Sequence, residues 1–224
     1  QAISGTACYT VFAAIDAAKE CILVQFFIIR NDALGKDLQQ RLIRKAKEGV
    51  KVCFLFDEIG SLMLPKRYIA ELRDAGVNAK PFNTRRGWLN PFQINFRNHR
   101  KIVVVDGRVA FVGGHNVGIE YLGQSKRFGH WRDTHIEVHG PAVAAIQWSF
   151  VQDWHCATDE ILQPPTVCNP ALPDPPPAAP PAAIPACAGN IIVLPTSPAF
   201  DVSVCSMMLL AAISAARHRI WITS

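Results

Sequence analysis

The hydrophobic pattern in the first half of the chain alternates between short apolar runs and amphipathic stretches. ILVQFFII at 22–29 and VKVCFLFD at 50–57 are rich in β-branched and aromatic residues and too short for typical buried helices, so we predict two interior strands. Residues 32–49 carry apolar side chains at helical spacing and end on a glycine, which indicates a helix. A helix over 65–75 and a short strand over 79–82 continue the alternation. This βαβαβ order predicts a largely parallel sheet with helices on its faces.

The pattern changes after residue 101. IVVVDGRVAFV at 102–112 joins two β-branched runs through Asp-Gly, which is a strong hairpin signal because glycine accepts a positive φ. THIEVHG at 134–140 predicts another strand, and PAVAAIQWSFVQDW at 141–154 predicts an amphipathic helix with proline in its first turn. We therefore expect an α/β fold whose sheet is mixed, though largely parallel, and flanked by helices.

The last third of the chain has a different composition. Prolines are concentrated between 164 and 185, where lysine and arginine are absent, which is typical of a semi-rigid linker. Beyond it, LLAAISAARHRIWI at 209–222 aligns with VFAAIDAAKECILV at 11–24, which indicates a tandem duplication. The predicted organisation is a first domain over 1–163, a linker over 164–189 and the truncated beginning of a second copy over 190–224.

Composition and charge narrow the function classes. Half of the residues are hydrophobic and 18% are charged, which favours a globular chain over a disordered one. No apolar run approaches the roughly 20 residues that span a bilayer. The seven cysteines have no CxxC spacing and several lie in apolar runs, so we expect reduced, buried thiols and a cytosol-facing setting. The net charge is +5, and basic residues gather in two groups, at 85–101 (Arg85, Arg86, Arg97, Arg100, Lys101) and at 126–132 (Lys126, Arg127, Arg132). This favours an anionic ligand, although a solvated face accounts equally well for any one arginine.

His99 and Lys101 stand at the start of the predicted hairpin. Alternate side chains of an extended strand share a face, so these two should project together while Arg100 points the other way. Histidine can attack a substrate or exchange a proton near neutral pH. Lysine supplies a positive charge that stabilises the additional negative charge of a phosphoryl transition state. The pair therefore predicts phosphoryl-transfer chemistry that requires no metal.

Further candidates for binding a phosphate follow at the end of the hairpin. Asn116 offers an amide donor, while Gly113 and Gly114 lack side-chain bulk, so that backbone and substrate can approach. Arg100, from the basic cluster, completes the set of candidate substrate-binding residues together with Lys101.

The full spacing H-x-K-x4-D-x6-G-G-x-N resembles the HKD signature of the phospholipase D superfamily. It is met by His99, Lys101, Asp106, Gly113, Gly114 and Asn116. The surrounding NHRKIVVVDGRVAFVGGHNVGIEYLG and the later WRDTH more narrowly resemble bacterial cardiolipin synthases. Superfamily members often carry serine where Gly114 stands, but the glycine pair is common in the cardiolipin synthase branch. The resemblance runs from about residue 5 to 156, resumes at 190, and implies a phospholipase D-like α/β/α sandwich.

The resemblance also implies roles. Two lobes would each give one HKD motif to a shared site, which uses no metal or other cofactor. We assign the nucleophile that forms a phosphohistidine to His99, while a second histidine beyond residue 224 would protonate the leaving alcohol. Lys101 and Asn116 would hold the phosphate, Asp133 of WRDTH would orient His99, and Asp106 would organise the hairpin. The chain by itself should be inactive unless two copies associate.

The implied reaction transfers a phosphatidyl group between phosphatidylglycerol molecules at the cytosol-facing side of the bacterial cytoplasmic membrane. The expected partners are this phospholipid, the membrane surface and the second HKD lobe. A phospholipase D or nuclease that uses water remains an alternative, but the basic cluster has few interleaved aromatic residues, so nucleic acid is the less favoured ligand. A non-catalytic lobe that binds lipid or a partner is the third alternative.

His135, Glu137 and His139 could share a strand face and imitate a metal site, but a phosphohistidine mechanism needs no metal.

Overall fold

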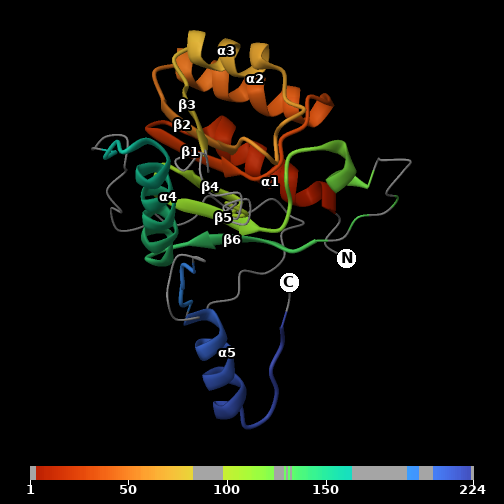
Figure 1. Ribbon diagram of the computed structural model, residues 1–224, viewed down its shortest axis with the longest axis vertical. Coiled ribbons are helices and arrows are strands. Elements are labelled where there is room, and N and C mark those ends of the chain that lie inside the picture. The colour runs from red at the N-terminus through yellow and green to blue at the C-terminus, as the bar shows by residue number, and fades with distance from the viewer. Residues whose placement is uncertain are drawn as a thin grey trace, which may run out of the picture.

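A mixed six-stranded sheet forms the centre of the computed structural model (Figure 1), with strand order β3-β2-β1-β4-β5-β6. The structure describes residues 4–82, 98–123, 129, 131, 133–162, 191–196 and 204–222. The strands are β1 (Cys21–Phe26), β2 (Lys51–Asp57), β3 (Asn78–Phe82), β4 (Ile102–Val105), β5 (Val109–Gly113) and β6 (His135–His139). Parallel pairing is confined to β3-β2-β1, and β1–β4, β4–β5 and β5–β6 pair antiparallel. The expectation of a mixed sheet flanked by helices is confirmed, but the sheet is not largely parallel, because three of its five strand pairings are antiparallel.

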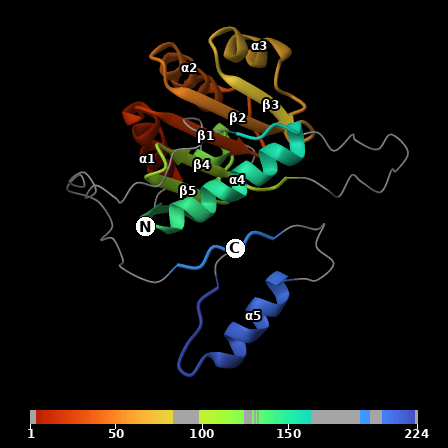
Figure 2. The same ribbon diagram turned by 90° about the vertical axis from the view of Figure 1, so that its left-hand side faces the viewer.

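Helices cover both faces of the sheet. One face is covered by α1 (Ser4–Ala17), α2 (Ala33–Lys47) and α3 (Lys66–Asp74), and the opposite face by α4 (Ala142–Thr158) (Figure 2). Strand residues alternate between the two cores, as the pleat requires: Ile22 and Val24 pack with α1 and α2, whereas Leu23 packs with α4. The short 3-10 helix η2 (Ile119–Leu122) follows the hairpin.

The carboxyl edge of β1 is the place where the sheet changes direction. β1 and β2 run parallel and end at this edge, and β4 begins there because it runs antiparallel to β1. The predicted strand over 22–29 ends early, at Phe26. Beyond it, Ile28 N donates to the side chain of Asn116 and Arg30 N donates to Val117 O, so the chain leaves β1 to join the loop after β5. Open α/β sheets bind ligands at such an edge.

The cysteines differ in part from their expected state. Cys8, Cys53, Cys156 and Cys205 carry free thiols, and Cys53 is buried. Cys21 is disulfide-bonded, so the expectation of reduced thiols is wrong for this residue. Cys156 and Cys205 are exposed, so the expectation of burial is wrong for both.

The predicted linker over 164–189 lies outside the described residues. After it, α5 (Val204–Ala215) has no buried residue. The division of the chain into two copies stays a prediction. Among the helices within the described residues, none combines the length and apolarity that a membrane crossing needs.

Candidate active site

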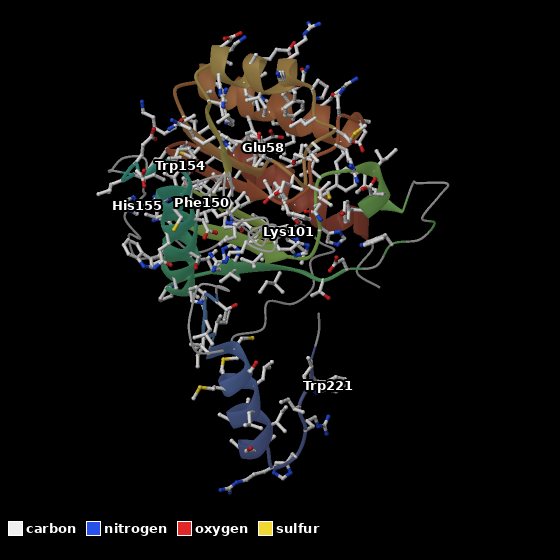
Figure 3. The ribbon with its side chains drawn as sticks, viewed as in Figure 1. Glu58, Lys101, Phe150, Trp154, His155 and Trp221 are labelled. Carbon is white, nitrogen blue, oxygen red and sulfur yellow. The ribbon has the colours of Figure 1, made fainter. Side chains whose placement is uncertain are left out.

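His99 and Lys101 lie side by side just ahead of β4. Lys101 Nζ is 3.0 Å from His99 Nδ1 and donates a hydrogen bond to the His99 carbonyl oxygen at 2.6 Å. Lys101 is only 3% exposed, whereas His99 is exposed. In Figure 3, Lys101 lies away from the labelled Phe150 and Trp154 of α4. An ammonium group is thus held beside one nitrogen of an imidazole that solvent can reach.

Burial sets the protonation states of this pair. Desolvation lowers the pKa of Lys101 to about 8, against the opposing charge of Asp133. Desolvation and the charge of Lys101 also lower the pKa of His99, while the carboxylates of Asp57 and Asp133 act to raise it. Near pH 7, His99 is therefore largely neutral, with a nitrogen lone pair available, and Lys101 is largely charged.

The ring of Phe27 covers the pair at the end of β1. Its centroid is 4.6 Å from that of His99, and Lys101 Nζ lies 5.4 Å from it, within range of a cation–π interaction. The ring supplies an apolar wall that fixes the imidazole and excludes water from one side of the ammonium. The apolar run predicted Phe27 as a strand residue, so its place over the site emerges only from the structure.

Asn116 lies beside this edge of β1 and is 5% exposed. Its Oδ1 accepts from Ile28 N at 3.0 Å, and its Nδ2 donates to Tyr121 Oη at 2.9 Å. These bonds fix the amide from both ends, and the amide group has a second N–H. Tyr121, in η2, is therefore a positioning residue that sequence analysis did not identify.

Gly113 and Gly114 make room for the segment that leads into β6. A β-carbon at Gly113 would overlap Thr134 O, and one at Gly114 would overlap the carboxylate of Asp133. The predicted space for substrate is thus filled by protein at both positions. Asp133 Oδ1 accepts from Thr134 N at 2.8 Å, and its charge acts on both His99 and Lys101. The glycine pair therefore allows Asp133 to approach the site.

Arg100 points to the opposite face of the sheet, as the alternation predicted. Its guanidinium donates to Asp153 Oδ1 in α4 at 2.5 Å and to Thr196 O at 2.6 Å. Asp153 also accepts from Gln25 Nε2 at 2.8 Å. The structure therefore does not bring Arg100 together with His99. Arg100 instead forms an ion pair with Asp153 of α4.

Asp106 lies at the far end of β4, about 16 Å along the strand from Lys101 at the usual rise per residue. It has a φ of 51° at the tip of the hairpin. Its carboxylate accepts three backbone N–H groups, from Lys19, Glu20 and Cys21, at 2.8–2.9 Å. These bonds join the hairpin to the start of β1, at the sheet edge opposite the site.

Replacing Asp106 by alanine should therefore reduce stability. Three N–H groups lose their acceptor and a non-glycine residue is left at positive φ, so we expect the free energy of unfolding to fall by roughly 2–4 kcal/mol. Urea denaturation measures this, and Asp74→Ala, which removes an exposed acid at the end of α3, should change it by less than roughly 0.5 kcal/mol. A fully stable Asp106→Ala variant would contradict this structural role.

Asp57, the last residue of β2, and Ser61, in the loop that follows it, also reach this edge. Asp57 is 2% exposed, and its Oδ1 accepts from Ile59 N at 3.0 Å and from Gly60 N at 2.7 Å. Ser61 Oγ accepts from Ile29 N at 3.2 Å and donates to Phe27 O at 3.3 Å. Sequence analysis did not identify Asp57 or Ser61, although Asp, Gly and Ser directly after an apolar run form a turn signal that could have drawn attention to them.

The three side chains of β6 that could imitate a metal site make separate contacts. His139 Nε2 lies 2.7 Å from Glu137 Oε1 on the exposed side of the strand, whereas His135 packs 5.8 Å from the His115 ring. Within the described residues, no group of three potential ligands could hold a metal ion.

Comparisons with known proteins agree with the motif. A family model described as "Cardiolipin synthase, PLD-like domain" matches residues 11–154. Cardiolipin synthase A of Pseudomonas putida (strain W619) is 49% identical over 99% of the chain and 44% of its own length, and that of Pseudomonas aeruginosa (strain LESB58) is 49% identical over 99% and 43%. The chain thus spans less than half the length of these relatives. A phosphatidylserine synthase structure from Haemophilus influenzae shares the fold, with a TM-score of 0.52 and 20% identity over 67% of this chain and 35% of that one.

Proposed function

The chain belongs to the family of phospholipase D-like domains of cardiolipin synthases, and from this membership we propose that it is one catalytic lobe of a phosphatidyltransferase. The donor and acceptor are phosphatidylglycerol, and the products are cardiolipin and glycerol. The observation that carries the proposal is the exposed His99 imidazole with the buried Lys101 ammonium 3.0 Å from its Nδ1.

The first half-reaction is an attack by His99 on the donor phosphodiester. The attacking atom is a ring nitrogen of the neutral His99 imidazole, whose Nδ1 lies 3.0 Å from Lys101 Nζ. An N–P bond forms while the bond from phosphorus to the headgroup glycerol oxygen breaks, and the histidine of the second HKD motif gives a proton to that oxygen. In the second half-reaction the same histidine takes a proton from a hydroxyl of the acceptor phosphatidylglycerol. The acceptor oxygen then attacks phosphorus and releases His99.

Lys101 and Asn116 hold the phosphate oxygens in both steps. The buried ammonium of Lys101 stabilises the charge of the transition state more strongly than it would in water. Asn116 contributes its second N–H. The carboxylate of Asp133 supports the imidazolium that develops on His99, and Gly113 and Gly114 let this carboxylate approach. Arg100 and Asp106 act through the fold.

Replacing Asp133 by asparagine tests the electrostatic role of this acid. The change removes the charge that raises the pKa of His99, so we expect a roughly 100- to 10,000-fold loss of kcat and a shift of the pH–rate profile to lower pH. The matched control is Glu137→Gln, which alters an exposed carboxylate in the neighbouring strand β6. An unshifted profile in Asp133→Asn would remove Asp133 from this role.

We also propose that residues 190–224 begin a second lobe. The repeat supports this, because α1 ends at Ala17 and α5 ends at Ala215, which are equivalent positions in the alignment of 11–24 with 209–222. The exposed apolar side chains of α5 would then pack in the rest of that lobe, which supplies the second histidine. The proposed setting is the cytosol-facing surface of the cytoplasmic membrane, where the lipid substrate is found.

The decisive experiment identifies the product. The polypeptide that contains this chain and the second motif is incubated with phosphatidylglycerol, and the lipids are analysed by mass spectrometry. Cardiolipin with an equal amount of glycerol supports the proposal. Phosphatidic acid as the main product would indicate a phospholipase D, and salt-sensitive cleavage of DNA would indicate a nuclease.

A further inference from the structure

We propose that the loop between β2 and α3 inserts Leu62 and Met63 into the surface of an anionic lipid bilayer, so that the bilayer meets the protein beside His99. The inference rests on the proposed function, because it names the surface from which the lipid substrate enters.

Leu62 and Met63 form an apolar tip. They are 70% and 76% exposed, whereas Ser61 before them and Tyr68 after them are 5% and 3% exposed. A single exposed apolar side chain is ordinary, but two large ones in succession at the end of a loop mark a contact surface. The chain turns outward here with its side chains in solvent and its base inside the protein.

The base of the loop is fixed by hydrogen bonds. Ser61 N donates to Asp57 O at 3.0 Å, and Leu64 N donates to Ser61 O at 2.8 Å. The Asp57 carboxylate holds two further N–H groups of the loop. The apolar tip is therefore presented in a defined conformation, which reduces the conformational entropy lost when it inserts into a lipid surface.

The loop lies next to the catalytic pair. Ser61 Oγ donates to Phe27 O at 3.3 Å, and the Phe27 ring packs against the His99 ring in a tilted arrangement with 4.6 Å between centroids. Gly60 lies so close to Phe27 O that a β-carbon would overlap it. A bilayer that takes up Leu62 and Met63 would therefore place phosphate headgroups near His99.

Exposed basic side chains lie on the helices that neighbour the apolar tip. Lys66 and Arg67 begin α3 directly after the loop. Lys36 lies in the first turn of α2, which is held against α3 by a hydrogen bond from Tyr68 Oη to Gly35 O at 2.6 Å. Arg67 also pairs with Glu71 at 2.6 Å, but its side chain remains 87% exposed.

Apolar side chains next to lysine and arginine are the composition of anchors that bind anionic lipid at the interface. Protein interfaces, in contrast, are depleted in lysine. The composition therefore favours a bilayer over a protein partner.

A local probe tests the insertion. We place an environment-sensitive fluorescent amino acid at Met63 of this chain and, as a control, at Ile161, which is 69% exposed beyond the end of α4. With phosphatidylglycerol vesicles we expect a blue shift at position 63 that brominated lipids quench, no shift at 161, and a much smaller shift with phosphatidylcholine vesicles. A local readout is needed because α5 also exposes apolar side chains.

No shift at 63 with phosphatidylglycerol would overturn the proposal. The same holds for an emission that is already blue-shifted without lipid, because a protein surface would then cover the loop. In the longer polypeptide, Leu62→Ser with Met63→Ser should lower turnover of vesicle phosphatidylglycerol at least tenfold but spare a monomeric short-chain analogue, and Ile161→Ser should affect neither. Equal losses on both substrates would also overturn it. Failure of the proposed function is distinguishable, because wild type would then form no cardiolipin-type product from either substrate, whatever the probe reports.

Discussion

His99→Ala is expected to abolish cardiolipin formation in the polypeptide that contains this chain. The variant lacks the atom that forms the N–P bond, so the first half-reaction has no nucleophile. Losses on removal of a nucleophile reach roughly a millionfold in kcat, and we expect at least a thousandfold here. Mass spectrometry of lipids formed from phosphatidylglycerol measures the product directly.

The fold should survive this change. His99 is exposed and contacts Lys101 and Phe27, so the free energy of unfolding should change by less than about 1 kcal/mol. His139→Gln, a change at an exposed histidine of β6, is the matched control and should leave the rate unchanged. Incubation with a donor labelled in its phosphate should give an acid-labile protein label in wild type and none in His99→Ala. Unchanged cardiolipin in the variant would reject the assignment of His99 as nucleophile.

Lys101→Met is expected to lower phosphatidyl transfer by roughly 100- to 10,000-fold. The change removes the ammonium that balances the phosphoryl charge but preserves the length and apolar stem of the side chain. Because the interaction strengthens in the transition state, the loss should fall mainly on kcat. Steady-state kinetics with phosphatidylglycerol separate kcat from KM, and a KM effect alone would contradict this reading.

The same substitution should stabilise the fold near neutral pH. Lys101 is 3% exposed, and burial lowers its pKa from 10.5 to about 8. At pH values below 8, holding the charged ammonium in the folded protein therefore lowers the free energy of unfolding by about 3 kcal/mol. This cost shrinks as the pH rises from about 8 toward the unfolded value of 10.5, where both states lose the proton. The stability gain of Lys101→Met should therefore be largest below pH 8 and decline above it, as denaturation at several pH values would show.

The rate of the wild-type enzyme should depend on the same proton. If the reaction needs charged Lys101, kcat/KM falls as the pH rises through about 8, because this parameter reports the free enzyme. Lys101→Arg retains the charge at all these pH values and should lose this alkaline limit, whatever its effect on the maximal rate. An alkaline limit that is unchanged in Lys101→Arg would assign it to another group.

By itself the sequence determined the local elements and the chemical pair. β-branched runs, helical spacing and the Asp-Gly turn are signals within a few residues, so β2, α2 and the β4–β5 hairpin follow from them. The alternation of side chains likewise places His99 and Lys101 together and Arg100 on the other face, because these residues are adjacent in the chain.

Only the tertiary structure decided how the pair is supported. Asn116 bonds to Ile28 across 88 residues, Asp106 to Lys19 across 87, and Ser61 to Ile29 across 32. These partners meet because the sheet order brings distant segments together at its two edges, and no local periodicity encodes that order. The burial that lowers the pKa of Lys101, and the use of Gly114 by Asp133, depend on the same packing. Residue spacing therefore specifies which chemistry is present, whereas long-range contacts set its geometry and charge.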